Sequence, residues 1–384
     1  MNILIIHTGG TISCTYENGI LTPRADIAPM IDRIFKTQHD VKLSHKHICS
    51  VLSENTDGKI LNKIISGVRK HVLSGKYDGV IVTLGSDTLA YTSAAISYAI
   101  GRSRVPCVTV CSNLPLSVPT ADRIANLKAA VAVIRSGKVK GALTVYPEKD
   151  GQVSVYRASR IMQQPPYFSA PVPAGETYGT VKDGNFFKNG KYVEGTDTFT
   201  IDKPIFSALS PIFLLNVYPG MTYPSLPRRT RAVILGTYHS GTLNTQSQET
   251  AKFAKHCKKR GIKVYVSAVT DGADYESMSV YEELSFIRLP ALSSPAAMYI
   301  KLWLLNSHTR KFTDEKLLSP LGGDLVAASV KPSSKNNVEG MAQPSASNLS
   351  EETKAFSKSS KSKETSSCSN SYITEYDTSV AEEN

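Results

Sequence analysis

The start of the chain constrains its fold more than any other stretch, because an apolar run there ends in two glycines and a threonine. Residues 3–6 (ILII) are typical of a buried strand, and residues 7–11 read HTGGT. Paired glycines allow a tight turn, so Thr11 is expected just beyond the end of that strand. Ligands of open parallel α/β sheets bind in the crevice at the carboxyl ends of the strands. The hydroxyl of Thr11 is therefore placed for chemistry.

A second stretch repeats this order of elements. Residues 77–83 form another strongly apolar run, which is followed by the turn residues Ser86 and Asp87 and by a helical pattern over residues 89–100. Two strand ends that carry hydroxyl groups can thus face one crevice. We expect Thr11 and Ser86 to lie close together, with the carboxylate of Asp87 beside them.

Strand and helix patterns continue to alternate along the chain, which predicts an α/β fold with a larger sheet first and a smaller unit after it. Residues 14–24 are polar and predict a loop or short hairpin over the end of the first strand. Further strands are expected at residues 41–51, 105–110, 141–146, 153–156, 212–218, 232–238 and 263–267. Helices are expected at residues 28–37, 60–72, 122–134, 247–260 and 295–306, the last with Trp303 in a core position.

Composition indicates two domains and a tail. With 384 residues, 41% of them hydrophobic, the chain can fill a core in each of two domains. Residues 165–204 are rich in Pro, Gly, Tyr and Lys, with a hairpin pattern at residues 185–193. We therefore expect an N-terminal domain over residues 1–175, a hairpin and linker over 176–209, a C-terminal domain over 210–326, and a disordered tail rich in Ser, Lys and Glu over 327–384.

Charge and cysteine content narrow the function classes. The formal net charge is +11, but no basic run alternates with aromatic residues, so nucleic acid is not expected as a partner. None of the six cysteines forms a CxxC pair, and Cys107 and Cys111 stand about 13 Å apart along one strand, too far for a disulfide. Free thiols are typical of a reducing compartment. With no signal peptide or long apolar segment in view, a cytoplasmic protein without membrane contact is predicted.

Patterns that would indicate a cofactor or a metal are missing from the sequence. Neither glycine turn is followed by the GxGxxG or GK[ST] pattern that phosphate binding needs. His45 and His47 alternate on one strand without a further cluster of His, Cys or Asp. We therefore expect no cofactor and no metal.

The hydroxyl of a threonine is a poor nucleophile at neutral pH. It needs a base, a cation that lowers its effective pKa, and donors for the oxyanion that its attack generates. Thr11, Ser86 and Asp87 supply two hydroxyls and a carboxylate, and the backbone N–H groups of the two turns supply donors. Taken alone, the TGGT stretch is also compatible with a purely structural turn.

The two stretches together resemble the two signatures of the asparaginase/glutaminase amidohydrolases. Residues 7–12 (HTGGTI) resemble the first signature, and residues 78–89 (DGVIVTLGSDTL) are similar to the second, usually DGxVxTHGTDTM. The resemblance covers about residues 1–310. It implies a flavodoxin-like N-terminal domain, a smaller C-terminal α/β domain, and hydrolysis of a small-molecule amide through an acyl-enzyme, in a homodimer or homotetramer.

This resemblance also implies roles for individual residues. Thr11 matches the primary nucleophile, Ser86 stands where a threonine is usual, and Asp87 matches its acidic partner. Ser53 and Glu54 match positions that hold the α-carboxylate and the amino group of the substrate. Further substrate contacts are expected from Gly10, Gly85 and Asn113.

Several departures from the family pattern concern activation of the hydroxyls. Gln163 stands where the catalytic lysine is expected, and a glutamine neither lowers the pKa of a hydroxyl nor carries its proton. Leu84 replaces the signature histidine. The family's loop tyrosine has no match, although Tyr16 on the same loop could substitute for it. The cations that could take the place of the missing lysine are Lys149, Arg157 and Arg160.

These departures leave three functions open. The first is an amidohydrolase that acts on asparagine or a related small amino-acid amide. The second is a catalytically impaired relative that binds an amino-acid-like ligand. The third is the glutaminase subunit of a tRNA-dependent amidotransferase of the archaeal type. The pair Glu54 and Asn55 resembles the sequence of that subunit, where many asparaginases carry Gln-Asp.

Overall fold

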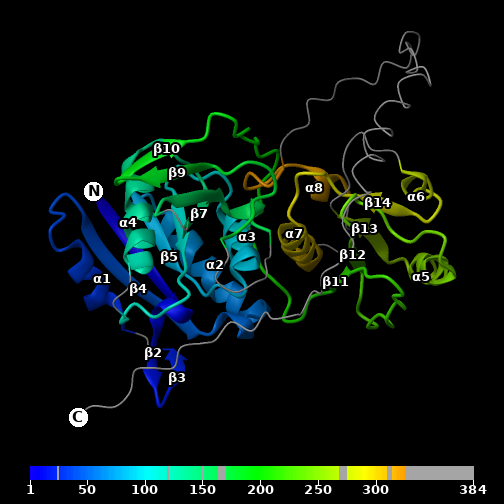
Figure 1. Ribbon diagram of the computed structural model, residues 1–384, viewed down its shortest axis with the longest axis horizontal. Helices are drawn as coiled ribbons and strands as arrows, with labels where there is room; N and C mark the ends of the chain where they lie inside the picture. Colours follow the sequence, from blue (N-terminus) through cyan, green and yellow to red (C-terminus); the bar gives the residue numbers. More distant parts are fainter. Residues whose placement is uncertain are drawn as a thin grey trace, which may run out of the picture. The chain divides into compact units, whose positions relative to one another are not determined.

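The computed structural model describes residues 1–23, 26–118, 121–148, 151–162, 170–267, 275–308 and 314–325. By its internal contacts the chain divides into two units, Met1–Ala328 and Ser329–Asn384. All described residues belong to the first unit. They form an eight-stranded sheet, a four-stranded sheet and a separate hairpin (Figure 1).

The large sheet has the strand order β10-β9-β8-β7-β6-β5-β1-β4. Its strands are β1 (Asn2–Gly9), β4 (Lys42–Val51), β5 (Gly79–Thr83), β6 (Cys107–Val110), β7 (Ala142–Pro147), β8 (Val153–Arg157), β9 (Gly179–Lys182) and β10 (Asn185–Lys188). The strands β4, β1, β5, β6 and β7 run parallel, and β8, β9 and β10 extend one edge in antiparallel fashion.

The order of the parallel strands confirms the predicted fold class. Numbered along the chain, these five strands lie in the order 2-1-3-4-5, which is the flavodoxin-like arrangement. Strand β4 lies on one side of β1, and all later strands lie on the other side. The switch point of the sheet is therefore between β1 and β5, where ligands bind in open α/β sheets.

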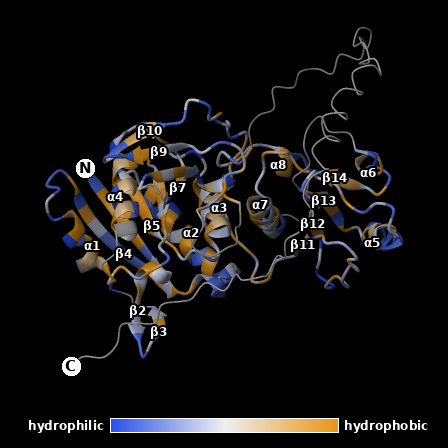
Figure 2. Cartoon of the chain, in the orientation of Figure 1, coloured by the Kyte–Doolittle hydropathy of each residue, from blue (hydrophilic) through white to orange (hydrophobic). Residues whose placement is uncertain are grey.

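Helices cover both faces of the inner parallel strands β1, β5, β6 and β7, which explains why nearly all of their residues are buried, whereas β4 is partly exposed. Along β1, Leu4 and Ile6 pack with α2 and α3, whereas Ile3 and Ile5 pack on the other face with α1 and α4. The helices are α1 (Ala28–Phe35), α2 (Gly58–Val72), α3 (Leu89–Ile100) and α4 (Ala121–Arg135). Hydrophobic colour is concentrated on strands such as β5, while the outer helix α5 (Gln248–Lys259) is hydrophilic (Figure 2).

The four-stranded sheet is parallel throughout and has the order β11-β12-β13-β14. Its strands are β11 (Ile212–Asn216), β12 (Ala232–Gly236), β13 (Lys263–Val266) and β14 (Phe286–Arg288). Helices α5, α6 (Glu276–Ser279), α7 (Pro295–His308) and α8 (Asp314–Leu318) complete this part of the chain. The side chain of Ser247 caps α5 by accepting a hydrogen bond from the N–H of Glu249.

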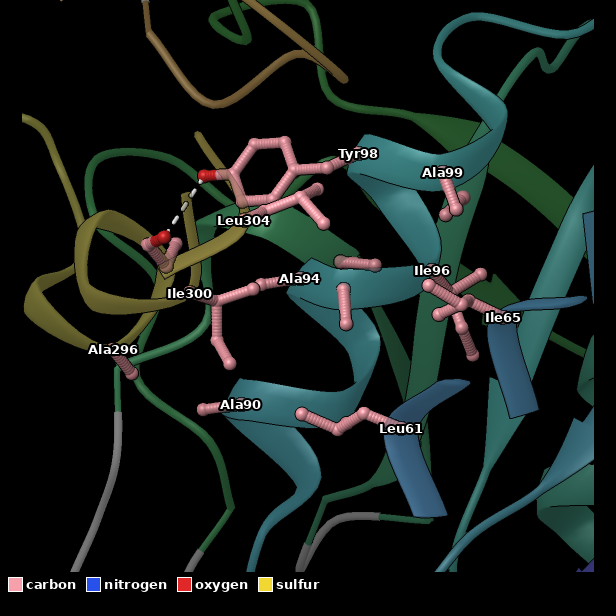
Figure 3. Close-up of a cluster of buried hydrophobic side chains, with 14 of the residues drawn as sticks. Leu61, Ile65, Ala90, Ala94, Ile96, Tyr98, Ala99, Ala296, Ile300 and Leu304 are labelled. Atoms are coloured by element: carbon pink, nitrogen blue, oxygen red, sulfur yellow. Dashed lines mark hydrogen bonds between the residues drawn. The ribbon is translucent and has the colours of Figure 1, made fainter. Parts of the chain in front are cut away.

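Helix α7 packs against α3 through a large apolar cluster. Figure 3 shows Ile300 of α7 beside Ala94 of α3, with Leu61 and Ile65 of α2 on the other side of α3. The hydroxyl of Tyr98 donates a hydrogen bond of 3.2 Å to the carbonyl oxygen of Ala297. Trp303 is 6% exposed, which confirms its predicted core position, and its indole N–H donates to Ser207 Oγ.

The structure defines the bounds of the two hairpins that the sequence predicted. The polar stretch near the N-terminus forms β2 (Cys14–Glu17) and β3 (Ile20–Pro23), joined by Asn18 and Gly19 with φ of 51° and 76°. Two central residues with positive φ are typical of a type I′ hairpin turn. Asp183 and Gly184 repeat this geometry between β9 and β10. The hairpin pattern predicted at residues 185–193 thus begins earlier and forms the edge of the large sheet.

The remaining expectations concern thiols, membranes and the tail. The described cysteines are all free thiols, as predicted: Cys14, Cys49, Cys107, Cys111 and Cys257. Within the described ranges, no helix is both long enough and apolar enough to span a bilayer. The tail predicted at residues 327–384 lies outside the described residues.

Candidate active site

Two glycine turns contact each other at the switch point of the large sheet. Gly10, directly after β1, has φ of 75°, and a Cβ atom built on it would lie 2.4 Å from the backbone nitrogen of Gly85. Gly85 follows β5, so the two turns meet backbone to backbone, at a distance that only glycine permits. Thr11 and Ser86, the next residues along the chain, are both half-buried. The sequence-predicted pair of turns therefore lies at one place.

A third turn, at the end of β4, joins these two. The N–H of Gly10 donates to the carbonyl oxygen of Val51 over 2.8 Å. Two residues later, Ser53 lies against the β5 turn, since a Cβ atom on Gly85 would be 2.3 Å from Ser53 Oγ. The ends of β1, β4 and β5 thus converge around Ser53 and the two glycines.

Hydrogen bonds link the β4 turn to the start of α3. Ser53 Oγ donates to Asp87 Oδ2 over 2.8 Å, and Thr88 Oγ1 donates to the carbonyl oxygen of Ser53 over 3.1 Å. Thr88 occupies the N-cap position of α3, yet its side chain makes no cap hydrogen bond because it reaches across to Ser53. Ser53 is only 6% exposed, so these bonds hold it in place. Thr88 is a site residue that the sequence analysis did not single out.

Two carboxylates border the site. Asp87 is exposed, and its charge acts on Cys111 at the end of β6, where burial first and Asp87 second raise the pKa of the thiol to about 12. Glu54 is exposed in the short helix Ser53–Asn55, and after burial its charge raises the pKa of Cys14. The region around the glycine turns is therefore suited to a positively charged group of a ligand.

Hairpin β2–β3 begins directly at the Thr11 turn and projects from the large sheet (Figure 1). Its base is bound to the turn, because Ser13 Oγ donates to the carbonyl oxygen of Gly9 and Cys14 Sγ donates to that of Gly10. Tyr16 lies on β2 opposite Leu21 and is 54% exposed. The structure thus places Tyr16 on a segment attached to the site, where the residue is about half exposed to solvent.

Asn113 lies at the same carboxyl edge of the sheet but further along it. Its side-chain amide donates a hydrogen bond of 2.9 Å to the hydroxyl of Tyr146, which belongs to β7. Asn113 follows β6, the second strand from β1 across β5. Asn113 therefore lies at the same edge of the sheet as Thr11 but two strands away from it.

The structure locates two of the three cations that could replace the missing lysine, Arg157 and Arg160. Arg157 donates to the carbonyl oxygens of Lys140 and Ala142, at the amino end of β7, and Arg160 donates to that of Gly323. The amino ends of parallel strands are the edge opposite to Thr11. Neither arginine therefore takes the lysine's place. Gln163 and Lys149 lie outside the described residues.

Histidines predicted to be surface or packing residues have defined partners. His47 Nε2 lies 2.9 Å from Ser50 Oγ, and His45 lies between Asp32 and His7. Within the described ranges, no group of three or more His, Cys, Asp and Glu side chains is arranged to hold a metal ion. The contact between His45 and His7 was not foreseen from the sequence, because it joins strands 38 residues apart.

The first part of the chain matches a known protein family. Residues 2–166 match the family model described as asparaginase, N-terminal. This range contains β1, β4, β5 and every site segment described above.

Related proteins were found among curated sequences. One subunit of the glutamyl-tRNA(Gln) amidotransferase of Sulfurisphaera tokodaii is 25% identical over 271 residues, which are 68% of this chain and 59% of that protein. The protein of the same name from Metallosphaera sedula is 33% identical over 135 residues, 35% of this chain and 30% of that protein. The chain thus spans less than two thirds of the length of these relatives.

Solved structures share the fold. The L-asparaginase of Thermococcus kodakarensis superposes with a TM-score of 0.67 at 22% identity, over 85% of this chain and 99% of that one. A probable cytoplasmic L-asparaginase from Campylobacter jejuni gives a TM-score of 0.64 at 20% identity, over 83% and 99%. At these identities the likeness establishes a common fold.

Proposed function

Since residues 2–166 of this chain belong to the asparaginase family, we propose that the protein is an amidohydrolase that hydrolyses the side-chain amide of asparagine or of a related small amino-acid amide. The observation that carries this proposal is the contact between the turns of Gly10 and Gly85 at the switch point. It brings a threonine hydroxyl, a serine hydroxyl and a carboxylate to the place where this class of sheet binds ligands.

In the proposed reaction, the hydroxyl oxygen of Thr11 attacks the amide carbon of the substrate. Backbone N–H groups of the two turns, other than that of Gly10, which donates to Val51, donate to the oxyanion that forms. Collapse of this intermediate breaks the carbon–nitrogen bond, and the nitrogen leaves as ammonia after taking up a proton. Water then hydrolyses the acyl ester on Thr11, which releases the acid and restores the hydroxyl.

Substrate selection is assigned to the residues around Ser53. The carboxylates of Asp87 and Glu54 can pair with the α-ammonium group of an amino-acid substrate. Backbone N–H groups of the turns can bind its α-carboxylate, and the hydroxyl of Ser53, which donates to Asp87 over 2.8 Å in the ligand-free chain, can donate to that carboxylate instead once the ammonium group pairs with Asp87. This division favours small zwitterionic amides over uncharged ones.

Activation of Thr11 is the step for which this chain departs from its family. Tyr16 stands on the hairpin whose base is bound to the Thr11 turn, and Ser86 follows the glycine turn that contacts the turn before Thr11. Gln163 has no acid–base capacity near neutral pH. We therefore propose a slow enzyme in which Ser86, Asp87 and Tyr16 carry the proton from Thr11.

The direct test is ammonia release by the purified full chain with asparagine, glutamine and related amides. Thr11→Ala is expected to lower the rate about 10³-fold or more. Thr196→Ala removes an exposed hydroxyl far from the site turns in the sequence and should keep the wild-type rate. Ammonia release from none of these amides by a folded protein would overturn the proposal, and calorimetric binding of an amide without turnover would favour the ligand-binding relative.

A second function is favoured by the names of the curated relatives. As a glutaminase subunit, the chain would release ammonia from glutamine for a partner protein and would do so slowly alone. A preference for glutamine over asparagine would support this role. For either function we expect a cytoplasmic homodimer or homotetramer, which light scattering on the full chain can test.

A further inference from the structure

Three ionisable side chains, on β1, β4 and α1, form a hydrogen-bonded chain that the proposed reaction does not use. His7 on β1 and His45 on β4 stack with ring centroids 5.2 Å apart, and His7 Nε2 lies 2.9 Å from His45 Nδ1. His45 Nε2 lies 2.9 Å from Oδ1 of Asp32 on α1. We call these three residues the histidine relay. It runs from a carboxylate that is 58% exposed to an imidazole that is 3% exposed.

The relay connects the strands of the site to the helix that follows the hairpin. His7 is four residues before Thr11, and His45 is eight residues before Ser53. Asp32 lies on α1, the first helix after β3. In addition to the backbone pairing of β1 with β4, one pair of side-chain hydrogen bonds therefore links these two strands to the helix that follows hairpin β2–β3.

Only one protonation state allows both hydrogen bonds of this relay to form. Ionised Asp32 accepts from His45 Nε2–H, which leaves His45 Nδ1 as the acceptor for the Nε2–H of His7. His7 Nδ1 is then an unprotonated acceptor, and it has no hydrogen-bond partner in the described part of the chain. One added proton, on either histidine, places an N–H at this buried atom without an acceptor. Such a donor is strongly unfavourable.

We propose that the histidine relay is a pH-sensitive latch, which in its neutral form keeps α1 on β1 and β4 and hairpin β2–β3 closed at the Thr11 turn, and which opens when it is protonated. This inference goes beyond the proposed function, since it concerns the position of the hairpin and holds for any reaction or ligand at the site.

Charged and titratable neighbours of His7 come from three segments. His45 and His47 face it from β4, Asp32 faces it from α1, and Asp26 faces it from the residues just before α1. The pKa of His7 is lowered from 6.5 to about 4, first by burial and then by the two histidines, while the two carboxylates oppose this change. A released imidazole regains its ordinary pKa in water. By linkage, lowering the pH from neutral to 5 increases the open fraction about 30-fold.

The thiol of Cys14 can report whether the hairpin is closed. Cys14 begins β2, is 2% exposed, and lies with Sγ 3.5 Å from the carbonyl oxygen of Gly10. We would measure its reaction with 4,4′-dithiodipyridine, which modifies thiols at acidic pH, by peptide mass spectrometry. Dividing each rate by that of the urea-unfolded chain at the same pH removes the pH dependence of the reagent. Cys107, fully buried on β6, reports global unfolding.

In the wild-type chain the normalised rate at Cys14 should rise about 30-fold between pH 7.5 and pH 5, with Cys107 still protected. His7→Leu removes the titrating group and should make the rate at Cys14 independent of pH. If that variant does not fold, His7→Gln, which keeps a donor toward His45 and does not titrate, should give the same flat profile. His47→Gln is the matched control on β4 and should retain the rise.

Three results would overturn the latch. The first is a wild-type rate at Cys14 that does not change down to pH 5. The second is an equal rise in the folded His7 variants. The third is a rise at Cys107 in parallel with Cys14, because the opening would then be global unfolding. None of these results depends on amide hydrolysis, so the latch and the proposed function can fail separately.

Discussion

Polar side chains differ in burial and in pairing between the candidate site and the packing contact of α3 with α7. At the site, Thr11 and Ser86 are half-buried, and Asp87 and Glu54 are exposed. Near the end of α3, by contrast, a fully buried lysine and a fully buried aspartate pair with each other. The first region keeps its polar groups open to a ligand, whereas the second uses its polar groups to hold the structure.

The paired region is centred on Lys301 of α7 and Asp324, both 0% exposed. Lys301 Nζ lies 2.7 Å from Asp324 Oδ2 and donates to the carbonyl oxygen of Ser319 over 2.6 Å. Asp324 also accepts from the hydroxyl of Tyr98 and from the N–H of Leu321. Since Lys301 and Asp324 compensate each other's charge there, loss of one partner leaves a buried charge uncompensated.

The largest effect is therefore expected from breaking this pair. Asp324→Leu leaves the ammonium group of Lys301 buried without its counterion and should lower the free energy of unfolding by about 3–5 kcal/mol. The double variant Lys301→Met with Asp324→Leu removes both charges and should recover most of this loss. Urea unfolding measures both variants. Equal stability of the single and double variants would show that the pair is not coupled.

The second largest effect is the pH dependence of stability that comes from His7. In the unfolded chain His7 binds a proton below pH 6.5, but in the folded chain it does so only below about pH 4. Stability is therefore constant above pH 6.5 and falls as the pH drops through this window, by up to about 3 kcal/mol. Urea titrations of wild type and His7→Gln between pH 7.5 and pH 4 should diverge in this way, and parallel curves would contradict the assignment.

A smaller effect is expected from a lysine at position 163, where the resemblance to the asparaginases implies the catalytic lysine. Gln163→Lys introduces a group that can lower the pKa of a neighbouring hydroxyl and carry its proton, and should raise ammonia release about 10–100-fold. Gln164→Lys places the same charge one residue further along and serves as the control. An increase in both variants would indicate a general charge effect, and no increase in either would show that activation does not limit the rate.

The smallest effect tests the link between the β4 turn and α3. Thr88→Val deletes the hydrogen bond to the carbonyl oxygen of Ser53 while keeping the shape of the side chain. The expected loss is about 1 kcal/mol of unfolding free energy, with a higher KM because Ser53 loses a support. Thr22→Val, on β3, is the control. A KM unchanged in Thr88→Val would indicate that Ser53 does not bind the substrate.

Much of this architecture could be predicted from local patterns. The apolar run at residues 3–6 and the glycines that follow it are enough to locate β1 and its turn, and the same pattern locates β5. The asparaginase signatures then connect the two turns. Ser53 and Asp87 could be named together only through that resemblance, yet the structure joins them by a hydrogen bond.

Other features could not be predicted because they depend on distant parts of the chain. His7 reads as part of a signature, and its stacking on His45 arises only when β1 pairs with β4. Thr88 reads as a helix cap but bonds instead to a turn 35 residues earlier. Strand β14 is only three residues long and has no alternation that could distinguish it from a loop.

Acylation of Thr11 at the switch point of the large sheet is tested most directly by quenching the protein in acid during turnover of asparagine and mapping the acyl adduct by peptide mass spectrometry. The proposed reaction predicts an aspartyl ester on Thr11 and none in Thr11→Ala. An adduct on Ser86 instead, or undiminished ammonia release by Thr11→Ala, would contradict it.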